Sequence, residues 1–196
     1  GFQRQAAEQV VSATLGTLSA LVDKSMLRVD SSGRYDVHEL LRQYGEEQLN
    51  LAMEESHQVR DRHCAYYAEF MQRREADVKG RRQIAALNEI ETDFENVRAA
   101  WSWTLARKNY NQIVDALESL FLFCERRGRF LEGVDLLEQA ATQLEAETTP
   151  ERRLQWGRVL TRNIWLLEHH RIVTEQHEIR KAQVQASQAI AEAYGD

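Results

Sequence analysis

The chain has 196 residues, 43% of them apolar and 8% aromatic, which is enough to bury one sizeable core or a solenoid of short helical units. One proline and nine glycines leave few helix breakers, so the composition predicts an all-α protein. The 31 acidic and 25 basic residues are mixed along the chain and give a formal charge of -6, which disfavours a basic groove for nucleic acid or anionic lipid.

The two cysteines and the apolar runs indicate where the protein resides. Cys64 and Cys124 lie far apart without a CxxC pair, so we expect two reduced, packed thiols and a cytoplasmic protein. No run of about 18 apolar residues occurs, so no membrane contact is expected. The start lacks an initiating methionine and a signal-peptide core, so we expect a segment of a longer protein.

Residues 1–54 are predicted to form the C-terminal part of a winged-helix domain. The apolar spacing changes from a helical period to an alternation of two and then returns to the helical period. The predicted elements are a helical stub at 2–11, a second helix that Ser12 could cap, a β-hairpin with strands at 26–30 and 34–38, and a helix from Glu39 to about 54. Within the hairpin, Leu27 and Val29 share one face, and so do Tyr35 and Val37.

Residues 55–196 are predicted to form a short α-solenoid of helical hairpins. The expected helices cover about 56–77, 84–105, 111–127, 129–146, a fifth opened by Pro150, and 174–194. The third and fourth match a tetratricopeptide-like pair, with large core residues before the turn at Gly128 and the small residues Gly133 and Ala140 after it. The last pair departs from that pattern, since Glu168 and Arg180 stand where apolar or small residues are expected.

Three strings together resemble one family: LSALVDKSML at 18–27, YDVHELLRQY at 35–44 and FENVRAAW at 94–101. The chain is similar over nearly its whole length to the bacterial signal-transduction ATPases with numerous domains, which include many large transcriptional regulators. The resemblance implies an NB-ARC nucleotide-binding module upstream, then a winged helix, then tetratricopeptide repeats.

Within the second string, His38 is the candidate ligand-binding residue. Val37-His38-Glu39 looks like the methionine-histidine-aspartate motif of this class, so the resemblance implies that His38 contacts the β-phosphate of ADP. Valine in place of methionine is a mild change, and glutamate in place of aspartate lengthens the carboxylate's reach. The alternative is a histidine that is hydrogen-bonded at a strand-helix junction and binds no ligand. The chain contains no phosphate loop, so we expect no cofactor here, and ADP or ATP only in the full-length protein.

Other functional classes are disfavoured by residue type and spacing. The histidine sets His57/His63 and His169/His170/His177 lack the i, i+4 pair of a helical zinc site, so no metal and no enzyme activity are expected. Direct DNA contact is disfavoured because the second helix offers only Lys24 as a cation. Basic clusters at 73–74, 79–82 and 126–129 are interpreted as solvated faces with acidic neighbours. Trp101 and Trp103 cannot share one stripe, so one of them could line a binding groove.

These observations lead to a functional hypothesis and a rival. The chain is predicted to be a non-catalytic regulatory segment whose winged helix senses nucleotide state through His38 and whose repeats bind a protein or small-molecule effector. The rival is a generic protein-interaction scaffold in which the winged helix only caps the solenoid. The residues upstream of Gly1 would separate the two.

Overall fold

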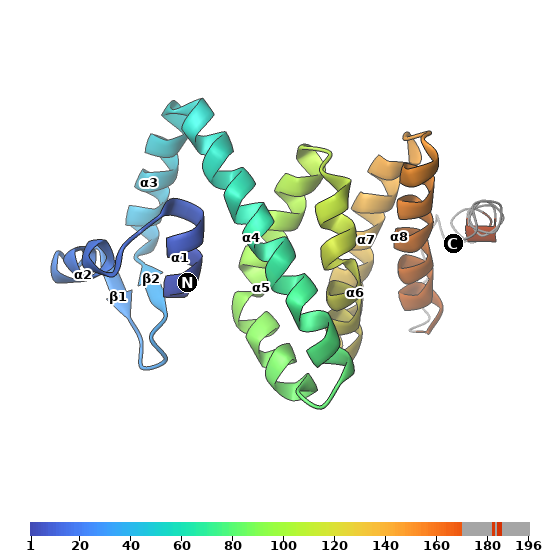
Figure 1. The fold of residues 1–196 in the computed structure, drawn as a ribbon, viewed down its shortest axis with the longest axis horizontal. Helices are drawn as coiled ribbons and strands as arrows, with labels where there is room; N and C mark the ends of the chain where they lie inside the picture. The colour runs from blue at the N-terminus through green and yellow to red at the C-terminus, as the bar shows by residue number, and fades with distance from the viewer. Residues whose placement is uncertain (170–181, 183, 186–196) are drawn as a thin grey trace. The chain divides into compact units, whose positions relative to one another are not determined.

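The structure is a computed structural model that describes residues 1–169, 182, 184 and 185 (Figure 1). It is mostly helical with one antiparallel hairpin, so the prediction of an all-α protein with a small hairpin is confirmed. The elements are α1 (Arg4–Val11), α2 (Leu15–Asp23), β1 (Leu27–Val29), β2 (Tyr35–Val37), α3 (Glu39–Leu51), α4 (Met53–Lys79), α5 (Gln83–Ala106), α6 (Tyr110–Arg126), α7 (Phe130–Glu145) and α8 (Pro150–His169). The helix predicted at about 174–194 lies outside the described residues.

The chain forms two compact units, and helices α4 and α5 each contribute residues to both. Unit 1 consists of Gly1–Tyr67 and Asp93–Trp103. Unit 2 consists of Ala68–Thr92 and the described residues from Thr104 onward. The predicted winged-helix and repeat assignments, with their boundary at residue 54, stay predictions.

A small apolar core holds helices α1 and α2 on the hairpin in unit 1. Its buried members are Ala7, Leu18, Leu27 and Tyr35, with Phe2, Ala13, Leu21, Val22 and Val37 packed around them. Phe2 and Tyr35 exchange backbone hydrogen bonds of 2.8 Å in both directions, and their rings stack with centroids 5.7 Å apart. Phe2 therefore extends the edge of the hairpin. The predicted helical range of 2–11 was wrong at this end, because α1 begins at Arg4.

The turn of the hairpin is organised by one aspartate. Asp30 Oδ1 accepts hydrogen bonds from the Ser32 and Arg34 amides, at 2.8 and 3.0 Å, and from the Ser32 hydroxyl at 2.6 Å. Gly33 supplies the left-handed conformation that the turn requires, with φ of 80°. In the hairpin register, Leu27 lies opposite Val37 and Val29 opposite Tyr35. Leu27 is buried, but Val29 is 46% exposed, so the predicted apolar face belongs to the core only at one end of β1.

The cap of the second helix differs from the prediction. Ser12 adopts a left-handed conformation, with φ of 55°, and ends α1. Thr14 caps α2, because its hydroxyl oxygen accepts the Thr17 amide at 3.1 Å. The prediction of Ser12 as the cap was wrong. Both residues have a side chain that can cap a helix, but Ser12 lies in the backbone reversal that ends α1, so Thr14 is the residue at the start of α2.

In unit 2, helices α6, α7 and α8 pack against one another, and each buries an apolar face. The predicted core positions of the third and fourth helices are all buried: Leu117, Leu120, Phe121, Cys124, Gly133, Leu137 and Ala140. Gly128 makes the turn with φ of 69°, and Pro150 begins α8 as predicted. A Cβ on Gly133 would lie 2.8 Å from Cys124 Cβ, so only glycine allows α6 and α7 to approach this closely. None of the described helices is long and apolar enough to cross a membrane.

Candidate functional site

His38 occupies the junction between β2 and α3 and caps the helix. Its backbone is extended, with φ of -61° and ψ of 138°, and its Nδ1 accepts the Leu40 amide at 3.3 Å. Its carbonyl accepts the amides of Leu41 and Arg42, which begin the helical hydrogen bonds. A nitrogen that accepts a hydrogen bond cannot carry the proton, so the neutral ring carries it on Nε2. The cap therefore leaves His38 with a hydrogen-bond donor at Nε2.

A cavity of about 580 Å³ in unit 1 includes His38 in its wall. Arg28 of β1, Arg42 of α3 and Asn96 of α5 also line this cavity, together with the carboxylates of Asp36 and Glu39. Both signs of charge are thus present, and the nearby ion pairs decide which charges remain available to a ligand.

The two arginines of this cavity differ in their partners. Arg42 donates to Glu39 at 2.7 and 2.8 Å and to Glu46 at 3.0 Å, so its charge is matched within α3. The hydrogen bonds from Arg42 lower the pKa of Glu39 to about 2, with a further contribution from Gln43. Arg28 lies opposite Asp36 in the hairpin register, and no ion pair of Arg28 occurs within the described part of the chain. Arg28 and the His38 Nε2–H are therefore the groups that suit an anion.

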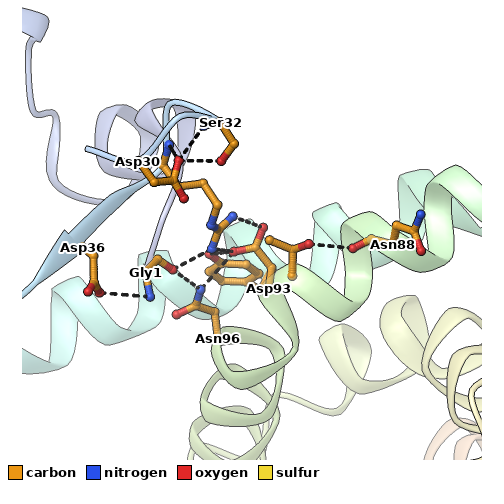
Figure 2. Close-up of polar contacts among 10 residues, drawn as sticks. Gly1, Asp30, Ser32, Asp36, Asn88, Asp93 and Asn96 are labelled. Carbon is orange, nitrogen blue, oxygen red and sulfur yellow. Dashed lines mark hydrogen bonds and ion pairs between the residues drawn. The ribbon is translucent and has the colours of Figure 1, made fainter. Parts of the chain in front are cut away.

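A buried carboxylate connects the hairpin to α4 and α5 (Figure 2). Arg34, which follows the turn, donates to Asp93 of α5 through both terminal nitrogens, at 2.9 and 3.1 Å. The Tyr67 hydroxyl of α4 and Asn96 Nδ2 of α5 donate to the same carboxylate at 3.3 and 3.0 Å. The side chains of Arg34 and Asp93 are only 12% and 6% exposed, so this is a desolvated ion pair.

The pKa shifts of Arg34 and Tyr67 keep both groups in the protonation state that donates to Asp93. The hydrogen bond to Asp93 raises the pKa of Arg34. Burial raises the pKa of Tyr67, and the negative charge of Asp93 adds to this effect. Arg34 therefore stays charged and Tyr67 stays a neutral hydroxyl donor at any pH at which the protein is handled.

Helix α3 exposes its apolar residues. None of its 13 residues is buried, although its sequence is amphipathic. Leu40, Tyr44 and Leu51, which the helical period places on one face, are 69%, 60% and 79% exposed. Met53, at the start of α4, is also exposed. This face begins two residues after His38 and is a candidate surface for another domain or protein.

The remaining histidines that the structure describes lie in separate places, at His57, His63 and His169. Within the described residues, no group of three or more histidine, cysteine, aspartate or glutamate side chains could hold a metal ion. The His63 ring is tilted by 51° against the Tyr67 ring with centroids 4.7 Å apart, and His57 lies against Trp103. Burial, and then the charge of Arg60, lowers the pKa of His63 to about 4. His170 and His177 lie outside the described residues.

The basic clusters are ion-paired along the helix surfaces. Arg73 pairs with Glu69, Lys79 with Glu75 and Glu118, Arg82 with Asp77 and Glu89, Arg126 with Glu125, and Arg129 with Glu91 and Glu132. Arg127 donates to Asn88. These partners match the interpretation of the clusters as solvated faces with acidic neighbours.

Two tryptophans of α5 have different environments, as their spacing predicts. Trp101 is buried, whereas Trp103 is partly exposed and donates from Nε1 to Asp61 at 2.8 Å. The Arg60 guanidinium lies 5.2 Å from the centre of the Trp103 ring. These contacts hold Trp103 of α5 against α4 in unit 1.

The Arg34–Asp93 pair was not predicted from the sequence. Its members are 59 residues apart, so no local pattern connects them. One signal was available, because Asp93 falls on the stripe of buried Ile90, Phe94 and Val97, where an apolar residue would be expected. A charge in such a stripe indicates a buried partner elsewhere in the chain.

Comparison with known proteins identifies no relative: no family model, no curated protein and no solved structure matches the chain.

Proposed function

We propose that this chain is a non-catalytic regulatory segment of a multidomain bacterial ATPase that controls transcription in the cytoplasm. In this proposal, residues 1–54 form the end of a winged-helix domain that reads the nucleotide state of an upstream NB-ARC module through His38. Residues 55–196 form tetratricopeptide-like repeats that bind a protein or small-molecule effector. No nucleotide is expected to bind this segment without the upstream module.

The observation that carries the proposal is the capping geometry of His38. The Leu40 amide occupies Nδ1, so the ring presents a neutral Nε2–H donor beside the cavity. Arg28 adds a positive charge to the same wall. A neutral donor with one guanidinium suits a phosphate oxygen of ADP, to which the family resemblance assigns this histidine.

The exposed apolar face of α3 supports the same proposal. Leu40 and Tyr44 lie two and six residues after His38 and are largely exposed, so an upstream module that docks here would bury them beside the bound phosphate. ADP held between that module and the winged helix would favour a resting state. An effector on the repeats would then shift the population away from it.

The test uses the longer protein that carries the upstream phosphate loop. His38→Asn should release ADP during gel filtration and raise basal transcription, because asparagine caps a helix well but does not reach as far as Nε2. His169→Ala, at an exposed position at the end of α8, is the matched control and should keep bound ADP and low basal transcription. A His38→Asn protein that retains ADP and stays silent would contradict the proposal.

The second candidate is a protein-interaction scaffold without nucleotide control. The α3 face favours it equally, because an exposed apolar stripe suits any protein partner. A parent protein without a phosphate loop, in which Tyr44→Ala weakens partner binding and His38→Asn does not, would support the scaffold. DNA binding is less favoured, because Thr14 and Thr17 are engaged in the α2 cap.

A further inference from the structure

The segment that carries His38 is attached to α5 through Arg34. Only the three residues of β2 separate Arg34 from His38, and a strand is extended and stiff at about 3.3 Å per residue. The Arg34 backbone is also bonded on the hairpin side, since its amide donates to Asp30 and its carbonyl accepts the Asp30 amide. This short, bonded strand is therefore a route by which a displacement of the Arg34 side chain would reach the start of α3.

The far end of this connection is held on several sides. Asp93 accepts four hydrogen bonds, two from Arg34, one from Tyr67 and one from Asn96 (Figure 2). Arg34 Nη2 and Asn96 Nδ2 also donate to the Gly1 carbonyl, at 2.8 and 3.0 Å. A buried carboxylate with this many donors has one favourable arrangement, and removing its charge takes from the buried Arg34 guanidinium the carboxylate with which it forms two hydrogen bonds.

The same network reaches the cavity beside His38. Asn96, which donates to Asp93, lines that cavity together with His38 and Arg28. One wall of the cavity thus belongs to α5, and the residue in that wall is bonded to the carboxylate that holds the hairpin.

We infer that Asp93 is a positioning residue for His38, and that the Arg34–Asp93 pair couples the His38 cavity to helix α5. The regulatory meaning of this coupling depends on the proposed function, because it is the route by which nucleotide contact at His38 would reach the helical region. The coupling itself is a property of unit 1 and is measured without nucleotide.

The experiment records nitrogen-15 imidazole spectra and amide exchange on the 196-residue chain. In the unmodified chain, His38 should show the Nε2–H tautomer alone. Asp93→Asn should convert it to a mixture of tautomers, because the cap at Nδ1 loosens. It should also speed exchange in peptides covering 27–37, on the order of a hundredfold. Asp61→Asn removes a carboxylate charge elsewhere in unit 1 and should change neither.

A milder variant covers the case in which Asp93→Asn does not fold. Tyr67→Phe removes one donor to Asp93 and keeps the ring, so it should shift the His38 tautomer in the same direction by a smaller amount. A wild-type His38 spectrum in Tyr67→Phe, or in folded Asp93→Asn, would overturn the positioning role even if hairpin exchange rises. A tautomer mixture in the unmodified chain would overturn it as well. None of these results depends on whether the longer protein retains ADP, so the inference and the proposed function fail separately.

Discussion

Single residues in unit 1 have roles that follow from the groups they contact. His38 uses one ring nitrogen to cap α3, and this fixes which nitrogen can serve a ligand. Asp30 and Asp93 illustrate two uses of a carboxylate. The first organises an exposed turn through local amides, and the second holds a buried guanidinium from a distant segment. In each case the neighbouring hydrogen-bond donors decide what the side chain does.

The lowered pKa of His63 predicts how the free energy of unfolding depends on pH. Burial lowers its pKa from 6.5 to about 4 in the folded chain, so below pH 6.5 the unfolded chain binds a proton that the folded chain does not. The contribution of His63 to stability is therefore complete above pH 6.5 and is lost as the pH falls. The free energy of unfolding should decrease by up to about 1.4 kcal/mol per pH unit from this group.

Urea unfolding of His63→Phe between pH 7 and 5 checks this assignment. Phenylalanine keeps a ring against Tyr67 and removes the titrating group, so the variant should show a shallower decrease in stability than the unmodified chain. Gln58→Ala, at an exposed position on α4, should keep the original slope. Equal slopes in the His63→Phe and unmodified chains would show that another group causes the pH dependence.

At the scale of elements, the apolar spacing in the sequence predicts helices α6 and α7 of unit 2 directly. Buried positions in α6 and α7 match the predicted stripes because a helix with a 3.6-residue period buries one face against its neighbours. Helix α3 has the same kind of stripe and yet buries none of it. Amphipathic spacing therefore predicts the existence of a helix but does not reveal whether a partner for its apolar face lies within the described chain.

The contact between α6 and α7 predicts opposite effects for two glycine substitutions. Gly133→Ala places a methyl group against Cys124 Cβ, which the α6 backbone holds in place, and overpacking of this kind costs about 1–3 kcal/mol. Gly45→Ala in α3 meets nothing within 4 Å, so it should raise the free energy of unfolding by about 0.5–1 kcal/mol. Thermal unfolding of both variants provides the measurement. Equal stabilisation by the two would contradict the close approach at Gly133.

For the molecule as a whole, the two cysteines report on the two units separately. Cys64 lies in unit 1 and donates to the Ala100 carbonyl at 3.3 Å, and Cys124 lies in unit 2. Both are buried, and burial raises the pKa of Cys124 to about 12. Since the thiolate is the reactive form, neither should react with a thiol reagent in the folded protein at pH 8.

Single-cysteine variants turn this expectation into a measurement. Cys124→Ala leaves Cys64 to report on unit 1, and Cys64→Ala leaves Cys124 to report on unit 2. Labelling should require denaturant in both variants, and the concentration needed gives the resistance of each unit to opening. Fast labelling of either thiol without denaturant would mean that its unit is open in solution.

The sequence alone was enough for the helical class, the hairpin and most element boundaries, because backbone period and turn residues are local properties. His38 was selected from the sequence through a family resemblance, and its role as a ligand-binding residue stays a prediction. The sequence does not show whether Ser12 or Thr14 caps α2, because both side chains can cap a helix. The backbone path between α1 and α2 decides for Thr14.

Tertiary structure alone decided the partners of the buried charges and the environment of His38. Arg34 and Asp93 meet because folding brings the hairpin turn to α5, and burial makes that pair depend on its exact set of donors. The Nε2–H form of His38 likewise depends on where the first amides of α3 point. A sequence pattern records which residues are apolar at which spacing, whereas long-range polar contacts depend on the distances that only the folded chain sets.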